Sequence, residues 1–460
     1  RVIAGAAAYG SFADARVVAS VHDARGQLEP AARAVVEEQV RRLAPGLLER
    51  RDESPVVAEA PTPLEATPLA AGRPSRRPRG RPRETPAVSD RPRRGGVNIV
   101  GDFTGSSDEA HAARTLTTAL SGYGLSVSTT SYCATRERGP WEWSHRDGGD
   151  YPFETTLLVL SPEDLANFAM DVGVAPFEGR YMIGVWPWDY DVPSPMMATA
   201  ARMLHEVWAP SRFAARAVGR ASDGRVSSVA LPALAATRRR APDDARCTFV
   251  TSVDFQTGVE RQNPDGVLAA YCEAFRPHAG HNLVIEALHA ARYPAEHARL
   301  AEAAARRPDV EVREVSDGRR LPTLDEGGDQ RLCVVSLHRS EGTGRLLSRA
   351  MMSGAATIAT RHSFAEEVHD EGSCLFVPCA VVPIPEAERR CAPGGQWAEP
   401  DLDGAARAMR TLADQPARGE ALATRARARA RRLLAPSVVA RDVRERARAI
   451  EDRRRTAAPR

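Results

Sequence analysis

Short apolar runs alternate with stretches of helical periodicity along most of the chain, from about residue 95 onwards. Continuous apolar runs joined by crossover helices are typical of parallel strands that are buried on both faces. A first apolar strand is followed by a helix that extends to about residue 120. In the first half of this region, we expect strands at residues 97–100, 155–160, 181–186, 206–209 and 226–231.

After a polar, Arg- and Pro-bearing break at residues 232–245, the same alternation restarts. It predicts strands at 247–253, 282–286, 310–315, 332–337, 356–359 and 374–377, helices at 264–275, 295–306 and 344–353, and a helical end from residue 402. Two doubly wound halves of similar size place a cleft at the carboxyl ends of both sheets, where ligands usually bind. We therefore predict an α/β protein of two Rossmann-like domains, at residues 95–240 and 241–435, followed by a C-terminal helix and Arg-rich tail at 436–460.

The first 94 residues follow a different pattern. Residues 1–51 contain one amphipathic stretch, at about 29–43, and we predict a short helical segment of unknown role there. Pro, Ala and Arg dominate residues 52–94, a composition that cannot bury enough apolar surface to offset the entropy of ordering, so we predict a disordered linker. An Arg-Pro tract can contact nucleic acid or anionic lipid, although a solvated tether is the simpler interpretation.

The amino-acid composition excludes some kinds of partner and some kinds of catalysis. The 460 residues carry 63 basic and 60 acidic side chains, a net charge of +3, and this balance gives no reason to expect a nucleic-acid partner. The sequence contains no lysine, which excludes catalysis through a lysine Schiff base. Seven scattered cysteines form no C-x-x-C pair, so we predict neither a disulfide framework nor a metal site, and we expect no cofactor. Because there is no long apolar run and no signal pattern, we expect a cytoplasmic protein with at most peripheral contact with a membrane.

The segment VSLHRSEGTGRLLSRAMMSGAATIAT, residues 335–360, is the most informative. A buried strand ends at HRSE, and Gly342-Thr343-Gly344 then opens a helix. Glycines let the backbone approach a ligand closely, and the first turn of a helix presents unpaired N–H groups at the positive end of its dipole. The turn is therefore a candidate phosphate seat, with Glu341 at its edge as an acceptor for sugar hydroxyls. A structural tight turn explains the same spacing about as well.

This segment resembles the donor-binding region of family-4 retaining glycosyltransferases, which have the GT-B fold. The similarity continues in family order: YMIGVWPWDYDVP and EVWAPSRFAARAV resemble the end of the first domain, FVTSVDFQTGVERQNPDGVLAAYCEAF the start of the second, and FVPCAVVPIP with WAEPDLDGAARAMRTL the closing segment. These blocks span residues 96–450, about three quarters of the chain. The resemblance implies two facing lobes, the first binding an acceptor and the second a nucleotide-sugar donor.

The resemblance also implies roles for individual residues. In the family, the first Glu of a Glu–seven residues–Glu motif binds the donor sugar, and Glu341 matches it as the catalytic candidate. The glycines of the turn match those that bring N–H groups near the sugar and diphosphate. A basic pair that neutralises the diphosphate falls on Arg261 and Gln262. The donor-binding candidates are Arg261, Gln262, His338, Gly342, Thr343, Gly344 and Arg349.

Two of these positions depart from the family pattern. The second Glu of the motif is Arg349 here; the family carboxylate accepts hydrogen bonds from ribose hydroxyls, whereas Arg has only donors. Gln262 replaces the second basic residue and removes a positive charge from the leaving-group site. A lost charge-assisted hydrogen bond costs about 1.5–3 kcal/mol, so both changes weaken donor binding unless Arg339 or Arg345 points into the cleft.

Acceptor-side candidates come from the first half. The segment GDFTGSSDE follows the first strand and supplies Gly101 and Gly105, and DEAHAAR at residues 108–114 stands where the family has a Gly-rich loop. His111 is a candidate base or acceptor contact, with a surface position on its helix as the alternative. Asp189 follows the carboxyl end of a buried strand, a functional location in this architecture, and a structural turn carboxylate is the equal alternative.

From these features we expect a retaining glycosyltransferase of polysaccharide biosynthesis that moves a hexose from a nucleotide sugar to a glycan or lipid-linked acceptor. Cations and amides would stabilise the leaving group, without a covalent protein nucleophile and without a metal. The alternative is a catalytically degenerate GT-B domain that serves as scaffold or regulatory partner of an active transferase, such as a second glycosyltransferase domain joined through the linker. The residues that separate these hypotheses are Arg349 and Gln262.

Overall fold

The computed structural model describes residues 92–457, apart from 134–138, 140, 142, 144–149, 174–175, 235–245, 316–322, 325–330 and 389. The helix predicted within residues 1–51 lies outside the described residues, and so does the predicted linker except for its last three positions.

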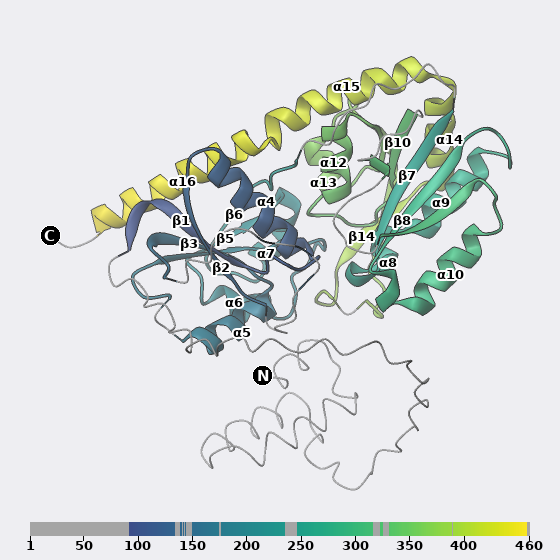
Figure 1. The fold of residues 1–460 in the computed structure, drawn as a ribbon. Coiled ribbons are helices and arrows are strands. Elements are labelled where there is room, and N and C mark those ends of the chain that lie inside the picture. The colour runs from purple at the N-terminus through teal and green to yellow at the C-terminus, as the bar shows by residue number, and fades with distance from the viewer. Residues whose placement is uncertain are drawn as a thin grey trace, which may run out of the picture. The chain divides into compact units, whose positions relative to one another are not determined.

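The first lobe is built on a six-stranded parallel sheet with the order β2-β1-β3-β4-β5-β6 (Figure 1). The strands are β1 (Arg93–Gly101), β2 (Ser126–Ser131), β3 (Phe153–Val159), β4 (Tyr181–Val185), β5 (Glu206–Ala209) and β6 (Arg225–Ser228), and the helices between them are α4 (Asp108–Gly122), α5 (Pro162–Val172), α6 (Met197–Ala201) and α7 (Arg212–Gly219). Ile99 packs on the face that α4 covers, and Val100 packs on the face that α5 covers. Both faces are therefore buried, which is why the strands read as continuous apolar runs.

The second lobe has a six-stranded parallel sheet with the order β12-β11-β10-β7-β8-β9. Its strands are β7 (Cys247–Asp254), β8 (Asn282–Leu288), β9 (Val310–Val315), β10 (Arg331–Ser336), β11 (Ala356–Thr360) and β12 (Leu375–Val377), and its helices include α8 (Val259–Gln262), α9 (Pro264–Ala274), α10 (Pro294–Ala304), α12 (Arg345–Ser353), α13 (Phe364–Val368) and α14 (Leu402–Asp414). The strand order reverses between β7 and β10. In doubly wound sheets, ligands bind at the carboxyl ends of the strands beside such a reversal.

The fold class predicted from the sequence, two Rossmann-like α/β domains, is confirmed. Three strands, β2 and the two strands of a hairpin, were not predicted. The edge strand β2 has the sequence SVSTTS, which carries no apolar run. The hairpin of β13 (Cys379–Pro383) and β14 (Gln396–Pro400) is antiparallel and belongs to neither large sheet. β2 is polar, and β13 has the largely apolar sequence CAVVP but mostly exposed side chains, so both strands are identified by their backbone pairing.

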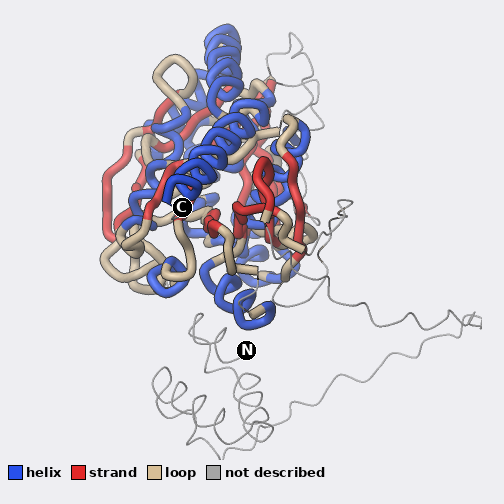
Figure 2. Tube along the Cα trace, turned by 90° about the vertical axis from the view of Figure 1, so that its left-hand side faces the viewer, coloured by secondary structure: helices blue, strands red, loops and turns tan. Residues whose placement is uncertain are grey.

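The last two helices extend along both lobes (Figure 1). The first of them, α15 (Pro416–Leu433), packs on α12 and β11 of the second lobe. The second, α16 (Pro436–Ala457), returns to the first lobe, where it packs on α4, β1 and β3. In Figure 2 this helix is the one that ends beside the mark of the C-terminus. Val443 and Ile450 belong to the same apolar cluster as the buried face of α4. The helix predicted within residues 436–460 is therefore part of the core of the first lobe. Among the helices that the structure describes, none combines the length and apolar character that a membrane span needs.

Candidate functional site

A small cavity lies at the carboxyl ends of β7, β8 and β10. Its volume is about 60 Å³, whereas pockets that enclose small-molecule ligands have volumes of about 300–1,000 Å³. In this conformation the cavity is therefore too small for a nucleotide sugar. Its lining includes the predicted donor residues Arg261, Gln262, His338 and Glu341, together with Arg345 and, from the first lobe, Asp108.

The turn before α12 depends on its two glycines. Gly344 has φ +69°, and a Cβ atom there would overlap the ring of Phe364. A Cβ atom at Gly342 would overlap the backbone oxygen of Trp188, which belongs to the first lobe. The backbone of the turn is also held from behind, because Ser363 Oγ accepts a hydrogen bond from Glu341 N at 3.1 Å. Gly342 therefore permits close contact between the two lobes, and Gly344 permits close packing of the turn on Phe364 within the second lobe.

Glu341 folds back on its own turn. Its Oε1 atom accepts hydrogen bonds from Gly344 N at 2.6 Å and Thr343 N at 3.2 Å, and its Oε2 atom lies 3.5 Å from Arg261 Nη1. Burial and the charge of Asp189 raise the pKa of Glu341 to about 8, although Arg261 and the Gly344 N–H oppose the shift. The catalytic candidate thus lines the cavity as a carboxyl group that ionises only in mildly basic solution.

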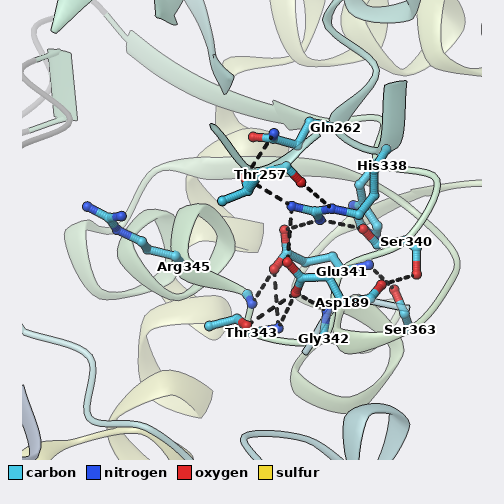
Figure 3. A network of polar contacts seen from close by, with 12 residues as sticks. Asp189, Thr257, Gln262, His338, Ser340, Glu341, Gly342, Thr343, Arg345 and Ser363 are labelled. Carbon is cyan, nitrogen blue, oxygen red and sulfur yellow. Dashed lines mark hydrogen bonds and ion pairs between the residues drawn. The ribbon is translucent and has the colours of Figure 1, made fainter. Parts of the chain in front are cut away.

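Asp189 occupies the predicted phosphate seat (Figure 3). Its Oδ1 atom accepts hydrogen bonds from Gly342 N at 2.9 Å, Thr343 N at 3.1 Å and Thr343 Oγ1 at 3.2 Å. Its Oδ2 atom lies 3.0 Å from Arg261 Nη2, and its backbone oxygen accepts a hydrogen bond from Ser340 Oγ. This first-lobe residue, predicted on the acceptor side, therefore binds the donor-side turn.

The predicted basic pair performs two different tasks. Arg261 is 2% exposed and donates from Nη1 to the Ser340 backbone oxygen at 2.7 Å. Burial alone lowers the pKa of Arg261, but the carboxylates of Asp189 and Glu341 more than reverse this effect and raise it. The Gln262 side chain instead forms hydrogen bonds with the backbone of its own loop. Its Nε2 atom donates to the backbone oxygens of Asp254 and Gly258, and its Oε1 atom accepts from Asp254 N at 2.8 Å. Of this pair, only Arg261 supplies positive charge to the cavity.

His338 forms hydrogen bonds with residues on both sides of its ring, near the turn. Its Nε2 atom lies 3.2 Å from the backbone oxygen of His362, and its Nδ1 atom lies 2.9 Å from Ser336 Oγ. Because a carbonyl oxygen can only accept, Nε2 carries the proton and Nδ1 accepts from the serine. Burial lowers the pKa of His338 to about 4, so the ring is neutral at pH 7.

The arginines that could compensate for Gln262 and Arg349 have other contacts. Arg339 pairs with Glu399, with Nε 2.7 Å from Oε2, and is not part of the described cavity lining. Arg345 lines the cavity, but its Nη1 atom lies 3.5 Å from Asp108 Oδ1, and Figure 3 shows its guanidinium directed away from Glu341. Arg349 lies on α12 outside the described lining. A guanidinium has only donors, so Arg349 cannot accept the hydrogen bonds that the carboxylate accepts at this position in the family.

The other first-lobe candidates shape the loop after β1. At Gly101, a Cβ atom would lie 2.8 Å from that of Ala113, so the glycine allows α4 to approach the sheet. Gly105 N donates to Asp102 Oδ1 at 2.9 Å, and its backbone oxygen accepts from Arg114 at 2.6 Å. Burial, with the positive charges of Arg345, Arg114 and Arg349, holds the pKa of His111 well below its ordinary value. Gly101, Gly105 and His111 are not part of the described cavity lining.

Sequence reasoning missed a second link between the lobes. Ser106 Oγ lies 2.6 Å from His289 Nε2, and His289 Nδ1 lies 2.7 Å from Asp254 Oδ1. His289 has φ +58°, a left-handed conformation that is uncommon for a residue other than glycine. Its one sequence signal is its position just after the strand predicted at 282–286, at a carboxyl end.

A wider cavity of about 490 Å³ lies between α7 and the segment that leads into α13. Arg212, Arg216 and Arg220 line it from the first lobe, and His362, Ser363 and Glu366 line it from the second. Ser363 also holds the Glu341 backbone, so this cavity adjoins the turn that Asp189 occupies. In the part of the chain that the structure describes, no group of three or more His, Cys, Asp or Glu side chains is arranged to hold a metal ion.

Comparisons with known proteins support the fold through structure alone. No protein-family model matches the sequence, and no curated protein is significantly similar to it. HepE from Anabaena, solved in complex with UDP-glucose, is 10% identical over 76% of this chain and 99% of that chain, with a TM-score of 0.52. Sucrose-phosphate synthase from Thermosynechococcus elongatus is 12% identical over 78% of this chain and 100% of that chain, with a TM-score of 0.53. These similarities confirm that the chain has the GT-B fold predicted from its sequence.

Proposed function

We propose that this protein is a glycosyltransferase that uses a nucleotide sugar as its donor. The observation that carries this proposal is the convergence of Arg261 with the Gly342 and Thr343 amides on a single carboxylate between the two lobes. A guanidinium and free amides at the start of a helix bind phosphate oxygens by the same charge-assisted hydrogen bonds. The position, at the carboxyl ends of a doubly wound sheet, is where such folds bind nucleotides.

The chemistry we propose is transfer of a hexose with retention of configuration. Arg261 neutralises the departing diphosphate, and the turn amides hold it as negative charge develops. Glu341, with its raised pKa, binds a sugar hydroxyl through a carboxyl group that can donate as well as accept. The acceptor is a glycan or a lipid-linked sugar, which we expect to approach from the wider cavity lined by Ser363. UDP-glucose is the first donor to test, because HepE has been solved with it.

A second candidate function is that of a degenerate GT-B domain acting as scaffold or regulatory partner of an active transferase. Gln262 favours it, because its side-chain amide is fully engaged by the backbone of its own loop. Arg349 favours it too, because it replaces a carboxylate with a cation. Binding of nucleotides separates the two candidates, since a scaffold has no need of a donor.

The test combines titration calorimetry with a transfer assay. We expect UDP or another nucleoside diphosphate to bind with micromolar or better affinity. We expect Glu341→Ala, which removes the carboxyl group that binds the sugar hydroxyl, to lower transfer on the order of 100-fold. Glu302→Ala is the matched control, because Glu302 is exposed on α10 of the same lobe and lines neither cavity, and it should retain activity. Absence of binding by every nucleoside diphosphate and nucleotide sugar would favour the scaffold.

A further inference from the structure

The loop that carries Asp189 is anchored on both of its sides. Trp188 Nε1 donates to the Val192 backbone oxygen at 2.8 Å, which closes the loop on itself. Tyr190 is buried and packs with Val192 against Cys391 of the second lobe. Asp189 is therefore presented to the second lobe by a loop that is held on both sides of this residue.

Asp189 and Glu341 together use the amides of the turn. Asp189 takes the N–H groups of Gly342 and Thr343, and Glu341 takes that of Gly344. Arg261 has both of its acidic contacts with the same two residues. The donors that a diphosphate or a sugar would require from this turn thus already bind carboxylate oxygens of the protein.

The charges in the seat make shared occupancy unfavourable. Asp108 lines the same cavity, and its pKa is raised by burial and by the negative charges of Asp189 and Asp254. Arg261 is the cation in contact with both Asp189 and Glu341. A diphosphate added beside Asp189 would place further negative charge in a buried site with few counter-charges. A donor and Asp189 must therefore exclude each other.

We propose that Asp189 is an internal competitor of the donor: its carboxylate fills the anion seat, joins the two lobes through Gly342 and Arg261, and must be displaced by lobe opening before a nucleotide sugar binds. This inference rests on the proposed function for the identity of the ligand, but the contact itself is independent of it. The protein is closed on itself, and the donor reaches the seat only in the fraction of molecules that open.

The closed contact can be tested without any ligand, by hydrogen exchange of the full chain. Asp189→Ala removes the acceptor of the Gly342 amide and one of the two acceptors of the Thr343 amide. We expect exchange of the Gly342 amide to accelerate at least tenfold. Asp191→Asn is the matched control: Asp191 lies in the same loop and accepts from Gln396 N at 2.9 Å, outside the seat. Exchange that is equally slow in wild type and Asp189→Ala would overturn the contact.

The competition is tested by titration with UDP. Asp189→Asn keeps an acceptor oxygen for the amides but loses the charge that pairs with Arg261, so this variant remains informative if Asp189→Ala does not fold. We expect UDP to bind Asp189→Asn at least tenfold more tightly than wild type, and Asp191→Asn to bind as wild type does. Equal or weaker binding by Asp189→Asn would overturn the competition.

The two proposals fail in different ways. If amide exchange accelerates in Asp189→Ala but neither wild type nor any variant binds a nucleoside diphosphate, the contact between the lobes is supported and the proposed donor is wrong. If wild type and Asp189→Asn bind UDP equally and amide exchange in Asp189→Ala is unchanged, the proposal of a nucleotide-sugar donor is supported. The proposal that Asp189 competes with the donor is then wrong.

Discussion

At the residue scale, the surroundings of Glu341 shift its pKa in opposite directions. Burial and the charge of Asp189 raise its pKa from 4.5 to about 8, while Arg261 and the Gly344 N–H favour the ionised form. The folded protein therefore binds a proton at this residue more tightly than the unfolded chain does. Its contribution to stability is fully present below about pH 4.5 and is lost as the pH rises through about 8.

This linkage predicts the effect of Glu341→Gln on thermal stability. The glutamine does not ionise, so the variant lacks the proton-linked term between pH 5 and 8. We expect the Tm of wild type to fall relative to that of Glu341→Gln across this range, and differential scanning fluorimetry at several pH values measures the difference. Glu366→Gln, whose carboxyl is exposed, should show no such trend. A Tm difference that does not change with pH would contradict the raised pKa.

The candidate site could be predicted in part from the sequence, because part of it is local. Glu341, Gly342 and Gly344 form one continuous turn, and Arg261 matches a basic position in the family that the sequence resembles. The partner of these residues could not be predicted. Asp189 lies 153 positions before Gly342, and their hydrogen bond exists only because two separately folded lobes come together.

At the element scale, strand positions could be predicted and their partners in space could not. The buried strands carry apolar runs, and the structure has strands at those places. The polar edge strand β2 lacks this signal. The sequence of the amphipathic helix α16 indicates that one face is apolar, but it does not indicate which surface this face covers. The chain connects it to the second lobe, whereas Val443 and Ile450 lie in the core of the first.

The packing of α16 predicts that its apolar face stabilises a lobe from which it is distant in sequence. Ile450 is 2% exposed, and removal of its side chain leaves a cavity between α16 and the first sheet. We expect Ile450→Ala to destabilise the protein by roughly 2–5 kcal/mol, measured by urea denaturation. Arg448→Ala, an exposed position on the same helix, should have little effect. Equal denaturation midpoints for the two variants would show that α16 does not stabilise the first lobe.

At the scale of the whole molecule, the two lobes are joined by polar contacts on both sides of the turn. Asp189 contacts Arg261 on one side, and Ser106 contacts His289 near the same cavity. On the other side, Glu367 of the second lobe accepts from the backbone N–H groups of Arg212, at 2.8 Å, and Phe213, at 2.7 Å. These are the first amides of α7, so the contact also places a negative charge at the positive end of that helix dipole.

Glu367 should therefore hold the two lobes together independently of the phosphate seat that Asp189 occupies. Glu367→Gln removes the charge and one of the two acceptor oxygens, and we expect a loss of about 0.5–2 kcal/mol, the usual value of a helix N-cap. The Tm should fall by a few degrees, and the radius of gyration from small-angle scattering should increase as the open form becomes more populated. Glu366→Gln is the control, since this neighbouring carboxylate is exposed. If both variants have the same Tm and radius of gyration, the α7 contact does not hold the lobes together, and closure depends on the contacts around Asp189.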